Sequence, residues 1–526
     1  MCSDTFENSE DSDLLQNNNN YKTHTFGGDG KILDKSIKRR RILAQCLVTA
    51  AVMLSSASCG MPVGYSAILL PQLKISNDSM QINDEMGSWI ASLHSAATPV
   101  GSLLSGIFMD RFGRKVAMQI ASTPLVVGWL IIGLAQNHIL LLIGRLVAGI
   151  SAGLAAAAGQ VFIGEISEPH LRGIFSSGPF ASYSFGILLV YALGFLLPWR
   201  EVAGLSIISP VTALAIYFFL PESPVWLVRR GRIEEAKASM LWLRGGDLSK
   251  AKEETEQLIH RCKVDSQEER ATLTVLLQPE VLKPLLIVNC FNAAQILSGT
   301  YLIVFYAVDI LRHVQGGERV NHFLAAVLTA CVRFLFSIMA GVLLTLIGRR
   351  TLAITSAFGT GVSATLLAIF LLATTPGSSY FSSTFSHCLA LDYVPAILIL
   401  VYVASNTMGF MILPGVLVSE LFPAKVRGLV GGLTFMIFNL LLFAVAKVFP
   451  LTKAYIGVSG VFWVFGGVSF MACVFLWLTL PETKALSLAQ IEDYFKTESL
   501  LWGRSSRKHR WSDSEAQVKL QVDRPQ

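Results

Sequence analysis

The sequence predicts an all-α polytopic membrane protein with twelve transmembrane helices in two six-helix halves and a short cytoplasmic helical insert. The first reason is composition: 52% of the 526 residues are hydrophobic and 15% are charged, whereas a soluble domain carries about 25% charged residues. The second is a series of apolar stretches, many of them long enough for the ~20 residues that a spanning helix needs. The third is an internal repeat.

The repeat consists of three short motifs, each present once in either half of the chain. The pairs are Gly113-Arg114-Lys115 with Gly348-Arg349-Arg350, Glu165 and Arg172 with Glu420 and Arg427, and Pro221-Glu222-Ser223 with Pro481-Glu482-Thr483. They indicate a duplicated unit of roughly 240–260 residues, which is too long for a solenoid repeat. Two membrane halves related by an axis along the membrane normal explain such a duplication.

The apolar stretches give the order of the spans. They are 42–68, 88–109, 116–136, 139–164, 174–197, 202–220, 281–311, 321–347, 352–374, 393–418, 429–450 and 457–480. The basic run Lys38-Arg39-Arg40-Arg41 precedes the first span, so the positive-inside rule places the amino terminus in the cytoplasm. An even number of spans returns the carboxyl terminus to the same side.

The expected organisation follows from these spans. A disordered cytoplasmic tail (1–41) precedes the first bundle (42–220); linker helices (221–280), the second bundle (281–480) and a cytoplasmic tail (481–526) follow. In the linker, helical periodicity is expected over 233–243 and 253–259.

Two short motifs lie outside the spans. Leu14-Leu15 resembles an acidic dileucine signal for a sorting adaptor, or is a chance pair in a disordered tail. Asn77, outside after span 1, begins an Asn-Asp-Ser glycosylation sequon whose use the sequence leaves open.

Motifs over about 40–490 resemble those of the sugar porter family of the major facilitator superfamily. They are Asp110-Arg111-Phe112-Gly113-Arg114-Lys115, Arg145, Glu165 with Arg172-Gly173, Pro221-Glu222-Ser223-Pro224-Val225-Trp226-Leu227, Gln295-Ile296-Leu297-Ser298-Gly299, Glu420 to Gly428, and Pro481-Glu482-Thr483-Lys484. The pattern is similar to insect facilitated trehalose transporters and to the intracellular class of animal hexose facilitators. The resemblance implies a facilitative carrier for trehalose or a hexose that works by alternating access.

Charged residues at span ends are the candidate gate. We expect pairs between them to latch the cytoplasmic ends of spans when the cavity opens outward. The set is Asp110, Arg111, Arg114, Arg145, Glu165 and Arg172 in the first half, and Arg349, Arg350, Glu420 and Arg427 in the second. The alternative is that these charges only set topology and snorkel. The acid that the family carries before Gly-Arg-Arg is replaced by Thr345, so the second latch lacks one carboxylate.

Polar residues inside spans are the candidate substrate site, because burying them in a membrane is costly. The set is Gln295, Tyr301, Tyr306, Arg333, Asn406 and Asn439. A carboxamide both donates and accepts, so Gln295 suits vicinal sugar hydroxyls; helix–helix hydrogen bonding is the alternative. Most of the family's other sugar-contacting positions are changed in this chain, as at Ile296 and Phe180. Arg333 is either a contact for an anionic substrate or a structural residue bonded to helix carbonyls.

The sequence is also compatible with other transport modes and substrates. Span 1 lacks the acid of the family's proton symporters, which favours facilitated diffusion, although His94 could titrate. A porter for another polyol or an organic anion, and a sugar sensor that moves nothing, are the alternatives. No enzymatic activity, cofactor or metal is expected, because the sequence shows no nucleotide-binding glycine loop, no metal-ligand cluster and no paired catalytic carboxylates in a span. No nucleic-acid partner is expected, because the basic residues flank apolar runs, where they set topology. The expected partners are a small-molecule sugar and the lipid bilayer, in the plasma membrane or an endosomal or lysosomal membrane.

Overall fold

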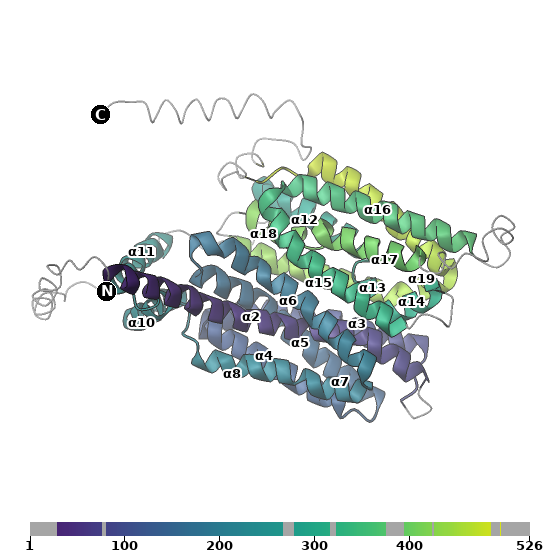
Figure 1. The fold of residues 1–526 in the computed structure, drawn as a ribbon, viewed down its shortest axis with the longest axis horizontal. Helices are drawn as coiled ribbons and strands as arrows, with labels where there is room; N and C mark the ends of the chain where they lie inside the picture. Colours follow the sequence, from purple (N-terminus) through teal and green to yellow (C-terminus); the bar gives the residue numbers. More distant parts are fainter. Residues whose placement is uncertain are drawn as a thin grey trace, which may run out of the picture.

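The computed structural model describes residues 29–75, 80–266, 278–315, 322–374, 394–422, 426–484 and 495. All the regular elements within these ranges are helices (Figure 1). Ten helices in the described part are long and apolar enough to cross a membrane. Two further predicted crossings are explained below, and together they account for the twelve spans expected from the sequence.

The first half contains six crossings. Its helices are α2 (Asp29–Ile75), α3 (Asp84–Phe112), α4 (Arg114–Gly133), α5 (His138–Ile166), α6 (Pro169–Leu196), and the short α7 (Trp199–Ser206) and α8 (Ile208–Phe219), which form one crossing. Helix α3 is the predicted span that falls outside the ten. It is rich in serine and glycine, and it packs against α5 and α19, so protein surrounds much of it.

Glycines allow α3 and α5 to approach closely. A Cβ atom on Gly153 of α5 would lie 2.1 Å from the carbonyl oxygen of Thr98, and one on Gly101 of α3 would lie 2.0 Å from that of Ile150. Small residues are the usual means by which membrane helices come into backbone contact. The pair α3 and α5 therefore forms a tight centre for the first half.

The linker folds into three short helices. These are α9 (Pro224–Arg229), α10 (Ile233–Leu243) and α11 (Leu248–Ser266). Their helical periodicity was predicted over 233–243 and 253–259, and both stretches are helical. Trp226 and Leu243 are buried, as an apolar residue in a polar insert should be, while Trp242 is 38% exposed. Helices α10 and α11 lie beside the start of α2 (Figure 1).

The second half contains more interruptions. Its elements are α12 (Pro279–Leu297), α13 (Leu302–Phe305), α14 (Ala307–Gln315), α15 (His322–Leu346), α16 (Arg349–Ala373), α17 (Val394–Ser405), the π-helix η3 (Asn406–Phe410), α18 (Leu413–Leu421) and α19 (Arg427–Thr479). At 1.5 Å per residue α19 would be about 80 Å long, more than twice the hydrocarbon thickness of a bilayer. It contains two crossings joined at Gly457, whose φ of 69° breaks the helix.

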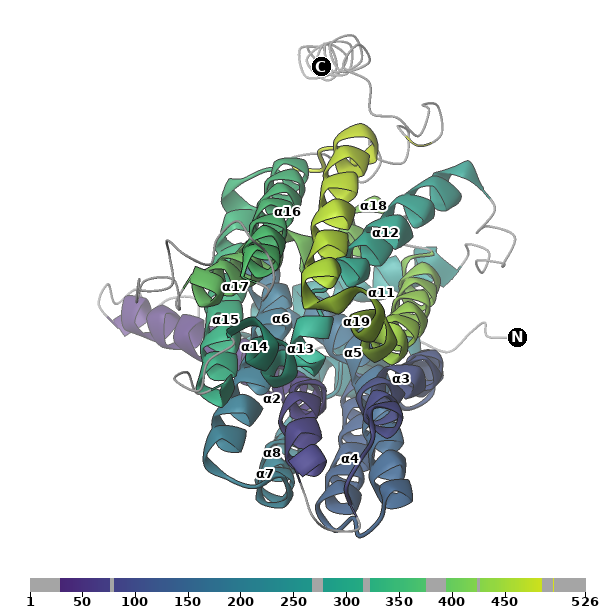
Figure 2. The ribbon, with the colours of Figure 1, turned by 90° about the vertical axis from the view of Figure 1, so that its right-hand side faces the viewer.

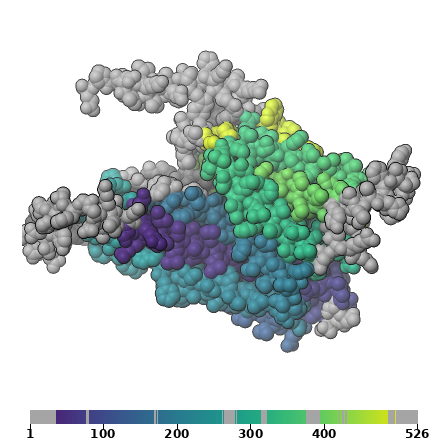
Figure 3. All heavy atoms as spheres, in the orientation of Figure 1, coloured from purple at the N-terminus to yellow at the C-terminus, as the bar shows by residue number. Residues whose placement is uncertain are grey.

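The two halves lie side by side (Figures 2 and 3). Helix α3 packs against α19, and α6 packs against α15, so both contacts join the halves. We call the end of the bundle that carries Gly113 and Gly348 the motif end. Near the opposite end one apolar core includes Tyr65 and Phe305, which belong to different halves.

Towards the motif end each half has a core of its own. Phe162 belongs to the core of the first half, and Phe422 belongs to that of the second. The halves therefore share one apolar core at the opposite end, whereas towards the motif end each half has its own core.

Candidate functional site

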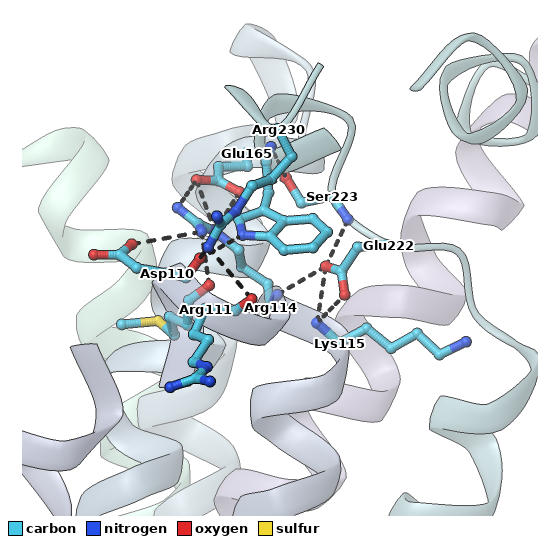
Figure 4. A network of polar contacts seen from close by, with 10 residues as sticks. Asp110, Arg111, Arg114, Lys115, Glu165, Glu222, Ser223 and Arg230 are labelled. Atoms are coloured by element: carbon cyan, nitrogen blue, oxygen red, sulfur yellow. Dashed lines mark hydrogen bonds and ion pairs between the residues drawn. The ribbon is translucent and has the colours of Figure 1, made fainter. Parts of the chain in front are cut away.

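The motif end of the first half is organised by a largely buried ion pair (Figure 4). Arg114 begins α4, and its Nη2 and Nε atoms lie 2.8 and 2.9 Å from Oε1 and Oε2 of Glu165 near the end of α5. This two-bond geometry is the strongest that arginine makes with a carboxylate. The Arg114 side chain is 5% exposed and that of Glu165 is 15% exposed. Asp110 stands further off, at 3.9 Å from Nη1.

A second carboxylate caps the start of α4 from a distant part of the chain. Glu222 accepts hydrogen bonds from the backbone N–H groups of Arg114 (2.8 Å) and Lys115 (3.0 Å). A negative charge at a helix start satisfies unpaired N–H groups and favours the helix dipole. Glycine suits this position, because Gly113 has a φ of 100° that other residues rarely adopt, and a Cβ atom there would displace the Glu222 carboxylate, 2.4 Å away at Oε2. Ser223 then donates from Oγ to Glu165, which closes the network.

The second half repeats this network. Arg349 Nη2 lies 2.9 Å from Oε1 of Glu420, and its backbone N–H donates to Glu482 Oε1 at 2.8 Å. Thr483 Oγ1 donates to Glu420 Oε2 at 2.5 Å, in the place of Ser223. A Cβ atom on Gly348 would lie 2.1 Å from Glu482 Oε2. The repeated motifs in the sequence are therefore one three-dimensional unit built twice.

The other predicted gate residues take different places. Arg111 stacks on Phe112 at 5.6 Å and points away from the network (Figure 4). Arg350 donates from Nη2 to the carbonyl oxygen of Trp477. The side chains of Arg172 and Arg427 lie outside the described residues, as do Asn77 and the Leu14-Leu15 pair.

The prediction that placed Arg145 with the other gate charges is wrong. Arg145 lies near the start of α5 and Glu165 near its end; twenty residues of helix separate them by about 30 Å. The fully buried guanidinium donates to the carbonyl oxygens of Ile90 (3.1 Å) and Pro62 and to Ser66 Oγ. Alternate spans run in opposite directions, so a residue early in span 4 belongs at the opposite end from one early in span 3.

A further charged cluster ties the linker helices to the first half. Glu168, between α5 and α6, lies 3.0 Å from Arg41 Nε and 3.7 Å from Arg244 Nε. Gln45 donates to its carboxylate at 3.2 Å. Arg244, at the end of α10, also lies 2.6 Å from Glu254 of α11. Neither these residues nor the capping roles of Glu222 and Glu482 were predicted from the sequence, although the repeated Pro-Glu motif marks Glu222 and Glu482.

A break in the seventh span forms the polar centre of the molecule. Helix α12 ends at Leu297 and α13 begins at Leu302, with Gly299 between them at a φ of 87°. A Cβ atom there would lie 2.3 Å from the ring of Phe465, so this bend requires glycine for both conformation and space.

Side chains of the tenth span complete this centre. Thr300 Oγ1 donates to Asn406 Oδ1 at 2.8 Å, and Asn406 Nδ2 donates to Ser298 Oγ at 3.3 Å. Gln295 Nε2 donates to the carbonyl oxygen of Met411 at 3.0 Å. Asn406 begins the π-helix η3, and such helices occur frequently at functional sites. We call Gln295, Ser298, Thr300 and Asn406 the break cluster.

Arg333 of α15 reaches the same break. Its Nη2 donates to the carbonyl oxygen of Thr300 at 2.7 Å, and its Nη1 lies 3.3 Å from Met411 Sδ. Its residue surface is 3% exposed. No carboxylate oxygen of the described residues lies within 4.0 Å of it. The structural interpretation, in which a helix carbonyl accepts from the guanidinium, describes these contacts.

The remaining predicted site residues divide into two groups. Tyr301 lies in the break and meets Phe438 edge-on, with ring centroids 5.5 Å apart. Tyr306 donates instead to the carbonyl oxygen of Ala446 at 3.0 Å. Asn439 donates to Phe435 of its own helix at 2.9 Å. The structure thus brings Gln295, Tyr301, Arg333 and Asn406 together around the break, and it gives Tyr306 and Asn439 backbone partners elsewhere.

These features define a class: a membrane transporter of the major facilitator fold, built from two halves with matched charged motifs and a broken central helix. The chain belongs to the family described as "Sugar (and other) transporter", whose model matches residues 39–495. This confirms the membership that the motifs predicted.

Individual relatives agree with the family. The chain is 30% identical to the facilitated trehalose transporter Tret1 of Culex quinquefasciatus, over 85% of either chain. It is 28% identical to that of Apis mellifera ligustica, over 88% of this chain and 90% of the relative. These relatives are transporters and not enzymes.

Solved structures confirm the predicted fold. The proton:xylose symporter XylE bound to 6-bromo-6-deoxy-D-glucose superposes with a TM-score of 0.69 at 20% identity, covering 86% of this chain and 100% of that one. The inward-open conformation of XylE from E. coli gives 0.68 at 20% identity, covering 85% of this chain and 98% of that one.

Proposed function

We propose that the protein is a facilitative sugar transporter for trehalose or a hexose that works by alternating access. The observation that carries the proposal is the break cluster. Its two amides and two hydroxyls are buried at an interrupted helix, where they bond to one another and to backbone carbonyls. Such groups both donate and accept, so sugar hydroxyls are able to replace these partners one for one. Interrupted helices are a frequent place for transporter substrate sites.

The two ends of the bundle support alternating access. At the opposite end a shared apolar core joins the halves, whereas towards the motif end each half has its own core and its own ion pair. The basic run Lys38-Arg39-Arg40-Arg41, near the start of α2, supports a cytoplasmic position for the motif end and for both chain termini. The domain organisation expected above, the plasma membrane as its location and the gating role of the charged residues belong to this proposal.

The contacts of Arg145 support facilitated diffusion over proton symport. Its partners are two carbonyl oxygens and a hydroxyl, and none of these groups titrates near neutral pH. His94 is the nearby buried group that could carry a proton, so symport through His94 is the outcome to test.

A second candidate is a porter for an organic anion. It is favoured by Arg333, whose buried guanidinium lies at the break without a carboxylate partner among the described residues. An acidic sugar would supply that charge.

Uptake into proteoliposomes tests the proposal. Labelled trehalose, glucose and an acidic sugar are compared with and without a proton gradient. Gradient-independent uptake of trehalose or glucose is expected. Uptake only of the acidic sugar would favour the anion porter, and uptake only with the gradient would favour symport through His94.

Two asparagines provide a matched pair of variants. Asn406→Ala should lower sugar uptake by about tenfold, because it removes the amide that accepts from Thr300 and donates to Ser298 in the break cluster. Asn439→Ala removes a side chain that, within the described residues, is hydrogen-bonded to its own helix alone, so it should lower uptake far less. Equal losses would contradict the assignment of the break cluster as the substrate site.

A further inference from the structure

A lysine joins the two halves at the end opposite the motifs. Lys447 of α19 donates from Nζ to Ser88 Oγ of α3 at 2.8 Å, and the same atom lies 4.0 Å from the ring centroid of Trp89. Phe443 lies one turn earlier on α19, with its ring centroid 6.2 Å from that of Trp89. Phe443 and Lys447 therefore present one face of α19 to the start of α3. We call this contact the lysine clip.

The clip lies far from the charged networks. Trp89 is near the start of α3, and Phe112 ends α3 beside Gly113; 23 residues of helix span about 35 Å. A second bond joins the halves on the same side of the molecule, since Tyr191 of α6 donates to the carbonyl oxygen of Val304 in α13 at 2.6 Å. The ion pairs of the motif end, by contrast, each lie within one half in the described part of the chain.

The chemistry of the clip suits a contact that must open repeatedly. No carboxylate oxygen of the described residues lies within 4.0 Å of Lys447, so its charge is met by an indole face and a hydroxyl. A cation over an indole is attracted by the ring quadrupole. This attraction is weaker than a desolvated ion pair, and Trp89 is 38% exposed, so each partner can return to water or to the membrane interface when the helices part.

The same stretch of α19 also holds the short helices after the break. Tyr306, between α13 and α14, donates to the carbonyl oxygen of Ala446, and its ring lies 4.8 Å from that of Phe449. Lys453 lies 2.6 Å from Asp309 of α14. A movement of α19 away from α3 would therefore act on α13 and α14, which adjoin the break cluster and also contact α2.

We infer that Lys447 is a positioning residue for transport: its clip onto Trp89 and Ser88 holds the opposite end closed, and release of the clip accompanies opening on that side. The inference rests on the proposed alternating-access function. It names the contact that separates the two states at this end.

Distances between spin labels test the clip in the full chain, with its native cysteines replaced. One label pair, at Glu85 and Tyr455, reports the opposite end; both positions are exposed and lie in different halves. A second pair, at Phe219 and Leu346, reports the motif end in the same way. Lys447→Met removes the charge at similar length, Trp89→Leu removes the ring, and Lys447→Arg keeps a cation that stacks on indole.

The expected result is reciprocal. Lys447→Met and Trp89→Leu should each raise the ratio of long to short distances at the opposite end by about threefold to tenfold, and should shorten the distances at the motif end. Lys447→Arg should resemble the unmodified chain. Unchanged distances, or lengthening at the opposite end without shortening at the motif end, would overturn the inference, because simple loosening gives the latter. The measurement needs no substrate, so absent sugar uptake would count against the proposed function alone.

Discussion

The charged networks of the two halves use the same parts but differ in burial. Side chains of the pair Arg114 and Glu165 are 5% and 15% exposed, whereas those of Arg349 and Glu420 are 21% and 22% exposed. The first network has Asp110 four residues before its arginine, and the second has Thr345 there.

The linker helices account for part of the difference. Trp226 of α9 donates from Nε1 to the carbonyl oxygen of Asp110 at 3.0 Å, and Arg230 donates to the same oxygen. These contacts place the linker directly beside the first pair. Charges interact more strongly as water is excluded. The same motif therefore gives a stronger ion pair in the first half than in the second.

The largest expected effect comes from removing Arg114, and removal of Arg349 is the matched comparison. Arg114→Ala leaves the carboxylate of Glu165 partly buried without its partner and should lower the free energy of unfolding by about 3–5 kcal/mol. Arg349→Ala should cost about 1 kcal/mol, because water reaches Glu420 more easily. Thermal unfolding of both variants in detergent measures the difference, and uptake should fall more in the first. Equal losses would show that burial does not distinguish the pairs.

The next largest effect concerns Glu168, which has no acidic counterpart because Pro423 occupies the matching position. Glu168→Gln should weaken the attachment of α10 and α11 by about 2 kcal/mol, since Arg41 and Arg244 lose a shared carboxylate. Limited proteolysis of the linker should then be faster. Glu256→Gln, an exposed change on α11, is the control and should leave the cleavage rate unaltered. A variant of Glu168 that resists proteolysis as the unmodified chain does would refute this role.

Comparing Gly113 with Gly348 distinguishes the cost of backbone strain from the cost of steric contact. Gly113 has a φ of 100° and a ψ of 172°, a region that other residues rarely enter, whereas Gly348 has an ordinary φ of −64°. Both lack room for a Cβ atom. Gly113→Ala should therefore destabilise the protein by about 1–3 kcal/mol more than Gly348→Ala. Melting temperatures of the two variants decide this, and a lower value for Gly348→Ala would reverse the argument.

The smallest expected change in stability comes from restoring the carboxylate that the second half lacks. Thr345→Asp places a carboxylate four residues before Arg349, as Asp110 stands before Arg114. The gain should be about 0.3–0.5 kcal/mol, and Asp110→Asn should lose a similar amount, because exposed pairs of this spacing contribute little. Added salt should abolish both changes in melting temperature. Salt-independent shifts would indicate a different cause.

Much of the architecture was predictable because membrane helices leave long apolar stretches. The pairing of Arg114 with Glu165 could also be anticipated, since both residues fall at span ends on one side and recur in the second half. Arg145 was misplaced although the direction of span 4 contained the answer. The capping by Glu222 and Glu482 was not anticipated, because the repeated Pro-Glu motif marks both residues but does not show that each caps a helix more than 100 residues earlier in the chain.

The substrate site was less predictable. A polar residue in an apolar span is conspicuous, but the sequence does not reveal whether its partner is a ligand or a backbone carbonyl. Tyr306 and Asn439 bond to carbonyl oxygens of α19, whereas Asn406 bonds to side chains across a helix break. Whether a polar residue belongs to the candidate site depends on its position relative to the interruptions of the seventh and tenth spans, which lie side by side. Only the three-dimensional arrangement shows this.

The long-range caps have a consequence for how the chain is made. Glu222 is synthesised 108 residues after Arg114, the residue whose N–H it accepts, and Glu482 follows Arg349 by 133 residues. As the chain leaves the ribosome, the start of α4 therefore lacks its acceptor, Glu222, until the sixth crossing has been synthesised. The first half can then close its own network before the seventh crossing exists, as domains that fold in order of synthesis do. A nascent chain halted just before Glu482 would contain a complete charged network in the first half and an incomplete one in the second. The uncapped start of α16 is then the feature by which a quality-control system could recognise an incomplete chain.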